Sequence, residues 1–232
     1  KPLHRFMPAG FYYKTFIKQK VWAKVENSIR ALSGFSESPT EEDVDVYDHI
    51  HHHAEVLIIG AGVAGISAAM EILNNSENER VILVDERPRL GGEIISELCS
   101  DNSAKEWLKS SVADLNVFRK EHSDRFTVLC NSTAYAWHDQ NFVEILETIT
   151  TAQSLADREI QTPRKINHKV RAKEVILATG AHERPMLFEA NDLSNIMLSQ
   201  SVRRYLNEFG VISGNNTIIY GNNDTIYQTA KD

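Results

Sequence analysis

The sequence predicts an α/β fold in which parallel strands alternate with helices. Three observations lead to this prediction: a short apolar strand at residues 55–59, a glycine-rich turn directly after it, and an amphipathic helix leading into a second apolar strand at residues 81–84. Strand, glycine turn, helix and strand within about thirty residues make one βαβ unit. This is the Rossmann-like arrangement, in which the strands form a buried parallel sheet.

The glycine turn follows the pattern Gly-x-Gly-x-x-Gly, at Gly60, Gly62 and Gly65. The motif is weak by itself, but here it follows a strand and opens a helix. In this setting the first glycine permits a tight turn, the second lets a pyrophosphate approach the backbone, and the third lets helix and strand pack closely. Amides at the helix N-terminus then bind the phosphates. The alternative interpretation is a glycine-rich turn without a ligand.

Asp85 and Glu86 stand where the second strand ends, about 20 residues after the last glycine. One of these carboxylates is expected to accept hydrogen bonds from an adenosine ribose hydroxyl. A carboxylate there repels a 2′-phosphate, so the sequence favours NAD or FAD over NADP. The neighbouring Arg87 could instead accommodate that phosphate, although its more common role is stacking near the adenine.

The remaining elements follow from hydrophobic periodicity. An antiparallel excursion with a polar loop is expected after the second helix, before the chain returns to the parallel sheet and ends in Thr179 and Gly180. A later strand resembles the start of a second nucleotide-binding domain, but it lacks the glycine motif. The expected elements are a helix over residues 105–120 and strands over 126–130, 142–150, 169–172, 174–178 and 217–220.

Composition divides the chain into an aromatic and basic docking arm (1–35), an acidic linker (36–53), the dinucleotide-binding domain (54–185), and a crossover with the truncated start of a second nucleotide-binding domain (186–232). The sequence predicts a helix over residues 20–32 of the arm, and the aromatic side chains of the arm are expected to pack on a neighbouring domain. Stacking on single-stranded nucleic acid is the less favoured reading of this arm. The linker ends in His49, His51, His52 and His53, which we interpret as linker polarity in preference to a metal site.

Bulk composition narrows the class of protein. The chain has 232 residues, 42% hydrophobic residues and a formal net charge of −7, which is typical of a soluble globular protein and argues against nucleic acid as the main partner. The two cysteines, Cys99 and Cys130, form no CxxC motif, so a reducing cytoplasm is the expected compartment. No membrane span or signal peptide is recognised. Both ends look cut, so an excerpt of a longer polypeptide is expected.

Two further motifs point to a known superfamily. Gly91-Gly92-Glu93 follows the acids, and Ala178-Thr179-Gly180 follows the returning strand. In this order the motifs resemble the glutathione-reductase-like (FAD/NAD(P)-binding) superfamily. The stretch from Phe6 to Phe16, together with Ala178 to Pro185, is more specific. It resembles the α subunits of heterotetrameric sarcosine oxidases and their relatives among opine-type amine dehydrogenases.

This resemblance implies a function for the whole assembly. In that family the α-subunit glycine motif holds NAD, whereas sarcosine is oxidised at FAD in the β subunit to give glycine, a one-carbon unit and hydrogen peroxide. FMN at the subunit interface relays electrons to oxygen, and a separate domain binds folate. The expected partners are therefore a flavin-bearing β subunit, small subunits and a small amine. Two alternatives remain open: an FAD-binding NAD(P)H-dependent reductase of the same fold, and a non-catalytic assembly subunit with a structural nucleotide.

The sequence offers no catalytic residue and no metal ligand. His138, His168 and His182 are acids or bases by type only, and each is expected to be a surface or loop histidine. The residues expected to bind the cofactor are Gly60, Gly62, Ala64, Gly65, Asp85, Glu86, Arg87, Gly92, Glu93, Ala134, Thr179 and Gly180.

Overall fold

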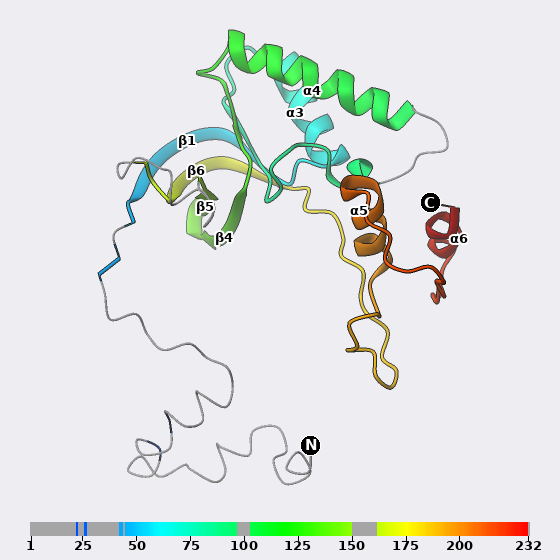
Figure 1. The fold of residues 1–232 in the computed structure, drawn as a ribbon. Helices are drawn as coiled ribbons and strands as arrows, with labels where there is room; N and C mark the ends of the chain where they lie inside the picture. The colour runs from blue at the N-terminus through cyan, green and yellow to red at the C-terminus, as the bar shows by residue number, and fades with distance from the viewer. Residues whose placement is uncertain are drawn as a thin grey trace. The chain divides into compact units, whose positions relative to one another are not determined.

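The apolar strands of the chain assemble into one mixed sheet. The computed structural model describes residues 22, 26, 42–43, 45–96, 103–149 and 162–231. Among these, strands pair in the order β3-β2-β1-β6-β5-β4; Figure 1 labels β1, β6, β5 and β4 of this sheet. The strands are β1 (Tyr47–Ile59), β2 (Val81–Val84), β3 (Phe126–Leu129), β4 (Ser132–His138), β5 (Phe142–Thr148) and β6 (Lys165–Leu177); the helices are α3 (Val63–Asn75), α4 (Ser103–Glu121), α5 (Ser199–Phe209) and α6 (Thr225–Lys231), with short 3₁₀ turns η2 (Gly92–Ile95) and η3 (Asp139–Asn141).

The parallel half of the sheet confirms the predicted Rossmann-like fold. β1 pairs in parallel with β2 and with β6, and β2 pairs in parallel with β3. All four residues of β2 are buried, as expected of a strand covered on both faces. Helices α3 and α4 pack on one face through a core that includes Ile58, Ile66, Leu83, Leu115 and Phe126.

The other half of the sheet is antiparallel. β6 pairs with β5, and β5 pairs with β4. A second core lies on the sheet face away from α3 and α4, and it joins this half to the parallel strands through Leu57, Val84, Ile145 and Val170. The predicted antiparallel excursion is therefore present, and it covers the side of the parallel sheet that the helices leave open.

Strand β1 is longer than the sequence predicted. It begins at Tyr47 and not near residue 54, and its first residues pair with the first half of β6. The amides of Glu55 and Val56 both donate to the Arg80 carbonyl, at 3.0 and 3.1 Å, while the pairing of β1 with β6 keeps one register throughout. Ala54 and Leu57, three positions apart, both belong to the second core. The buried residues therefore do not alternate strictly along β1, and the predicted end of the linker lies inside the sheet.

Two more strands differ from the prediction. β6 is a single strand of 13 residues, whereas the sequence suggested two strands near residues 169–172 and 174–178. β4 was not predicted. A register shift between Ala134 and Ala136 interrupts its pairing with β5, so its side chains do not alternate regularly.

The segment after the sheet contains α5 and α6 but no strand at residues 217–220, where one was expected. A strand needs a neighbour to pair with, and within the described residues this segment has none; Ile218 is 95% exposed. α5 is held beside the end of η2, because the Ser96 hydroxyl donates to Glu208 at 2.6 Å and the Asn207 amide donates to the Ser96 carbonyl at 2.6 Å.

Some predictions lie outside the described residues. These are the docking arm over 1–35 with its helix at 20–32 (apart from the helical Trp22 and Glu26), most of the linker before Asp45, Cys99, and most of the loop 151–167. Within the part of the chain that the structure describes, no helix has the length and apolar content needed to cross a membrane.

Candidate functional site

The glycine turn lies at the carboxyl end of β1, between β2 and β6. The Gly60 amide donates to the Val84 carbonyl at 2.8 Å, and Gly60 has a φ of +104°, which L side chains rarely adopt. A Cβ on Gly60 would lie 2.2 Å from the Ala178 carbonyl oxygen. The backbone that leads into Thr179 and Gly180 therefore lies directly against the first glycine, and both of these residues are exposed beside it.

Helix α3 opens towards solvent at this turn. Gly62 is its N-cap residue, no side chain caps the helix, and its first turn contains no acidic residue. Val63 and Ala64 are exposed, so their amide hydrogens remain available to an anion. Gly65 serves the packing instead, because a Cβ there would lie 1.8 Å from the Gly60 carbonyl oxygen.

Asp85 joins the second strand to the glycine turn. The side chain is 8% exposed. Its Oδ2 accepts the Ala61 amide at 2.6 Å, and its Oδ1 accepts the Arg87 amide at 2.8 Å. The neighbouring Glu86 is exposed. Of the two predicted acids, Asp85 thus fixes the loop backbone, and Glu86 presents its carboxylate to solvent.

The Gly91-Gly92 pair packs on the glycine turn as a second backbone layer. The Gly91 amide donates to the Ala61 carbonyl at 2.8 Å, and a Cβ on Gly92 would lie 2.8 Å from the Cα of Gly62. Arg87 also holds this second layer in place. Its guanidinium donates to the Gly92 carbonyl at 2.7 Å and pairs with the Glu93 carboxylate at 2.5 Å. Ala61 and Gly91 were not among the predicted site residues, and the only signal for them was their place inside the two glycine motifs.

The start of β4 completes this edge. The Ser132 amide donates to the Asp85 carbonyl at 2.9 Å, and the Asn131 amide donates to the Arg87 carbonyl at 3.0 Å. Ala134 lies two residues further along β4, half-buried against the second core. The structure therefore gathers the predicted site residues from both glycine turns, the end of β2, the start of β4 and the turn after β6 at one edge of the sheet.

The histidines require a correction. His168 was expected on the surface or in a loop, but it lies on β6 and is 3% exposed. Its Nε2 lies 2.7 Å from Glu147, and its Nδ1 lies 2.9 Å from His52 Nε2. Burial and the neighbouring His168 and His51 lower the pKa of His52. His52 thus belongs to a partly buried network across β1, β6 and β5 and not to a linker.

The other two histidines are where the sequence placed them, since His138 and His182 are both exposed. His138 lies at the end of β4, with its Nε2 3.1 Å from Glu144. Across the described residues, no group of histidine, cysteine and carboxylate side chains is arranged to hold a metal ion.

Comparison with known proteins identifies relatives of this chain. The family described as pyridine nucleotide-disulphide oxidoreductase matches residues 54–218. The chain is 37% identical to sarcosine oxidase subunit alpha of Corynebacterium sp. (strain U-96), over 84% of this chain and 20% of that protein. It is 33% identical to sarcosine oxidase subunit alpha of Rhizobium meliloti (strain 1021), over 99% of this chain and 23% of that protein. The chain thus spans about a fifth of the length of these curated relatives.

A solved structure has the same fold. The crystal structure of L-proline dehydrogenase from P. horikoshii superposes with a TM-score of 0.54 at 24% identity, covering 72% of this chain and 31% of that one. The predicted fold class and the predicted resemblance to sarcosine oxidase α subunits are both confirmed.

Proposed function

The chain belongs to the pyridine nucleotide-disulphide oxidoreductase family, and on that premise we propose that it is the NAD-binding part of an oxidoreductase subunit of the sarcosine oxidase α type. The observation that carries this proposal is the uncapped N-terminus of α3, which faces solvent directly behind Gly60 and Gly62 and beside the acids that end β2. A dinucleotide pyrophosphate requires such exposed amides and a close backbone approach.

The residues present fit a dinucleotide. A Cβ on Gly62 would have only the Cα of Gly92 within 4 Å, at 3.8 Å, so the missing side chain leaves open space above the turn. The amides of Val63 and Ala64 would hold the phosphates there, and Glu86 would accept the ribose hydroxyls. Asp85 would act by holding the Ala61 amide in place.

Charge favours NAD over NADP. Arg87 is the cation closest in sequence to a ribose 2′-phosphate site, but its guanidinium is engaged by the Gly92 carbonyl and the Glu93 carboxylate. An added 2′-phosphate would meet the carboxylates of Asp85 and Glu86 without a free arginine to neutralise it. The choice of NAD over FAD rests on the similarity to sarcosine oxidase α subunits.

We further propose that the full-length subunit works with a flavin-bearing partner and smaller subunits in the oxidative demethylation of sarcosine or a related secondary amine. A bound dinucleotide would supply redox chemistry at the glycine turn or would stabilise the fold there.

The decisive experiment is identification of the nucleotide. The full-length subunit is purified and denatured. The compound that it releases is then identified by its absorbance spectrum and its mass. Recovery of NAD supports the proposal. Recovery of FAD with no NAD would favour the flavin reductase of the same fold, and recovery of no nucleotide would contradict a dinucleotide site at Gly60.

A further inference from the structure

One face of the sheet, along β1 and β6, carries a row of histidine, lysine and arginine side chains. Alternate residues of β1 and β6 point to the same side of a sheet, and the register pairs His49 with Asn167, His51 with Lys169, and His53 with Arg171. His49, His51, His53 and Arg171 are exposed. We call this surface the basic face; it comprises His49, His51, His53, Lys165, Lys169 and Arg171.

The cations of the basic face have no acidic partner. Within the described residues, no carboxylate pairs with Lys165, Lys169 or Arg171. The Arg171 guanidinium instead donates to the Gln140 carbonyl at 3.3 Å and lies 5.0 Å from the centre of the Phe142 ring. Lys165, Lys169 and Arg171 therefore bring three positive charges to one face of a chain whose net charge is −7.

One carboxylate on this face, Glu144, lies opposite Lys169 in the β5–β6 register. Glu144 accepts hydrogen bonds from Tyr135 at 3.0 Å and Asn167 at 2.9 Å, and it lies 3.1 Å from His138 Nε2. These contacts hold the pKa of the Glu144 carboxyl below its usual value, chiefly through the bond from Asn167. Glu144 therefore positions Tyr135 and, as an anion, offsets one of the three positive charges, so the face keeps an excess of positive charge.

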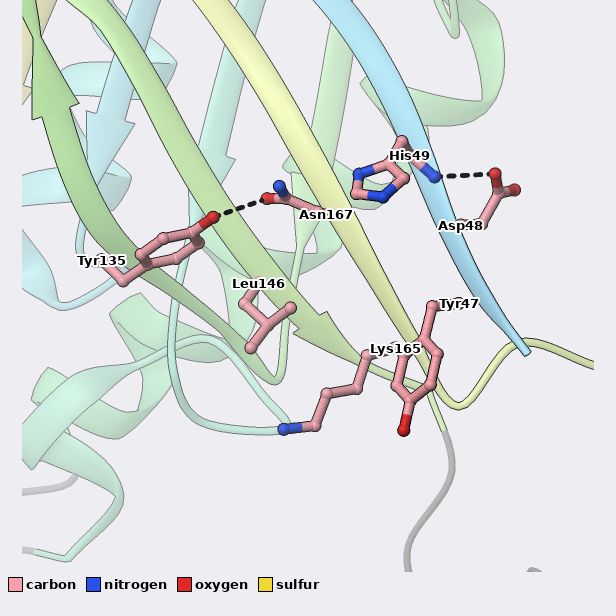
Figure 2. Close-up of a pocket in the computed structure, with 7 residues that line it drawn as sticks. All are labelled: Tyr47, Asp48, His49, Tyr135, Leu146, Lys165 and Asn167. Atoms are coloured by element: carbon pink, nitrogen blue, oxygen red, sulfur yellow. Dashed lines mark hydrogen bonds between the residues drawn. The ribbon is translucent and has the colours of Figure 1, made fainter. Parts of the chain in front are cut away.

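A pocket of about 380 Å³ lies at one end of the basic face. Figure 2 shows its side chains over β1, β6, β5 and β4, with the Tyr135 hydroxyl directed at Asn167. Leu146 and the Tyr135 ring give it an apolar lining, and Lys165 stands beside them. Its lining residues are Tyr47, Asp48, His49, Tyr135, Leu146, Lys165 and Asn167.

The dimensions favour a macromolecular ligand. Lys165 and Arg171 are separated by six residues of one strand, which corresponds to about 20 Å at about 3.3 Å per residue. A small anion would neutralise one end only. Exposed tyrosine and arginine beside an apolar pocket are typical of protein interfaces, and the acidic balance of the chain disfavours nucleic acid.

We propose that the basic face is the docking surface for an acidic segment of a partner polypeptide, whose carboxylates pair with Lys165, Lys169 and Arg171 while an apolar side chain enters the pocket beside Tyr135. This inference rests on the proposed function, in which the chain works inside a multi-subunit assembly. Because Arg171 is exposed and Lys165 and Lys169 are only half-buried, association must weaken as ionic strength rises.

The test compares two charge reversals in the full-length subunit co-expressed with its partners. Lys165→Glu with Lys169→Glu changes the basic face, and Lys109→Glu with Lys120→Glu makes the same change in net charge on α4. Native mass spectrometry at low and moderate salt measures the assembled fraction. We expect the first pair to weaken assembly at least tenfold and the second to leave it within twofold, and nucleotide content to be unchanged in both.

A second readout is the rate at which acetic anhydride labels Lys165 and Lys169. We expect both lysines to be slow in the complex and fast in the isolated subunit. Slow labelling in the isolated monomer would mean that the chain covers its own basic face, and slow labelling only at high concentration would mean a second copy; either result overturns the proposal. Equal assembly of the two double variants also overturns it.

A direct probe separates this proposal from the proposed function. A fluorescent peptide of ten glutamates around one phenylalanine should bind the wild-type subunit and should lose at least tenfold in affinity with the Lys165 and Lys169 reversals. Preference for an oligonucleotide over this peptide, or no binding at all, contradicts the docking surface. Absence of nucleotide or of partner subunits from wild-type preparations would contradict the proposed function. Binding of the peptide would still test the docking surface independently.

Discussion

The Oδ2 atom of Asp85 accepts the Ala61 amide hydrogen at 2.6 Å, which ties the end of the second strand to the middle of the glycine turn. Through its other oxygen the same carboxylate holds the Arg87 amide, and Arg87 in turn holds Gly92. The two glycine motifs and the acid are thus one hydrogen-bonded unit. A nucleotide that binds here meets a backbone already arranged for it, so little ordering is needed on binding.

The two acids should therefore respond differently to neutralisation. Asp85→Asn keeps one acceptor oxygen but places an amide NH₂ against a backbone N–H donor, so we expect a loss of about 1.5–3 kcal/mol in the free energy of unfolding. Glu86→Gln should leave stability unchanged and weaken nucleotide binding by about 1–3 kcal/mol. Urea denaturation and nucleotide titration check both. Equal effects of the two variants on stability would contradict the assignment of Asp85 to the loop.

Substitutions at two glycines of the motif, Gly62 and Gly65, should have separate effects on nucleotide binding and on folding stability. The backbone of Gly62 has a φ of −77°, and a Cβ there meets nothing closer than 3.8 Å. We therefore expect Gly62→Val to fold with a stability within about 1 kcal/mol of wild type but to lose the nucleotide, because the side chain occupies the space of the pyrophosphate. The nucleotide content after gel filtration measures this loss of binding. Undiminished retention of the nucleotide would contradict the assignment of this turn as the phosphate site.

Gly65→Ala is the matched control. Its Cβ would lie 1.8 Å from the Gly60 carbonyl oxygen, so the helix must move away from the strand, at a cost of about 2–3 kcal/mol. Thermal denaturation should show this loss even without nucleotide. A Gly65→Ala protein as stable as wild type would mean that helix and strand do not pack as closely as described.

The Glu55–Arg80 pair predicts a pH dependence of stability. Hydrogen bonds from the Arg80 side chain and backbone lower the pKa of Glu55 from 4.5 to about 2. A lowered folded-state pKa stabilises the protein above the unfolded value, and this stabilisation is lost as pH falls from about 4.5 towards 2. Because Arg80 is half-exposed, solvent screening limits the contribution to about 1 kcal/mol.

Carbon-detected NMR titration of Glu55 checks this prediction. In Arg80→Ala the midpoint should rise towards 4.5, and the stability difference between wild type and Glu55→Gln should vanish near pH 2. A Glu55 midpoint that does not change in Arg80→Ala would contradict the role of the pair.

The parallel half of the fold was predictable because its signals are local. A buried strand, a glycine turn and an acid at the next strand end all lie within the span from Glu55 to Asp85, and the structure places them together. The positions of Gly92 and Gly180 beside the glycine turn were predicted from local motifs of the same kind, Gly91-Gly92-Glu93 and Ala178-Thr179-Gly180. Burial on both faces makes such strands continuously apolar, which is the clearest pattern a strand can have.

Other parts of the fold were less predictable because their pattern depends on distant partners. The residues before Ala54 are polar on both sides, since His51 faces outward beside Lys169 and His52 bonds to His168, which lies 116 positions away. Nothing local shows that a histidine run completes a strand. In the same way, residues 217–220 have the composition of a strand but no neighbour among the described residues, so the pattern alone predicted a strand that does not form.

The last prediction concerns the chain of 232 residues expressed by itself. Several large apolar side chains after the sheet are exposed, among them Leu187 at 90%, Ile212 at 73% and Ile218 at 95%. Exposed apolar surface of this kind normally marks a contact with other protein, and the chain spans about a fifth of the length of its curated relatives. We therefore expect the isolated chain to bind NAD, to aggregate more readily than the full-length subunit, and to produce no peroxide from sarcosine.

The measurement is oxygen consumption with sarcosine and related secondary amines, for the isolated chain and for the full-length subunit reconstituted with its flavin-bearing partner. Light scattering of the same samples records aggregation, and Leu187→Ser with Ile218→Ser should reduce it without restoring turnover, because the proposed site of amine oxidation is on another polypeptide. Amine-dependent turnover by the isolated chain would place the active site among the residues described here, and the assignment of oxidation to the flavin-bearing partner would then be wrong.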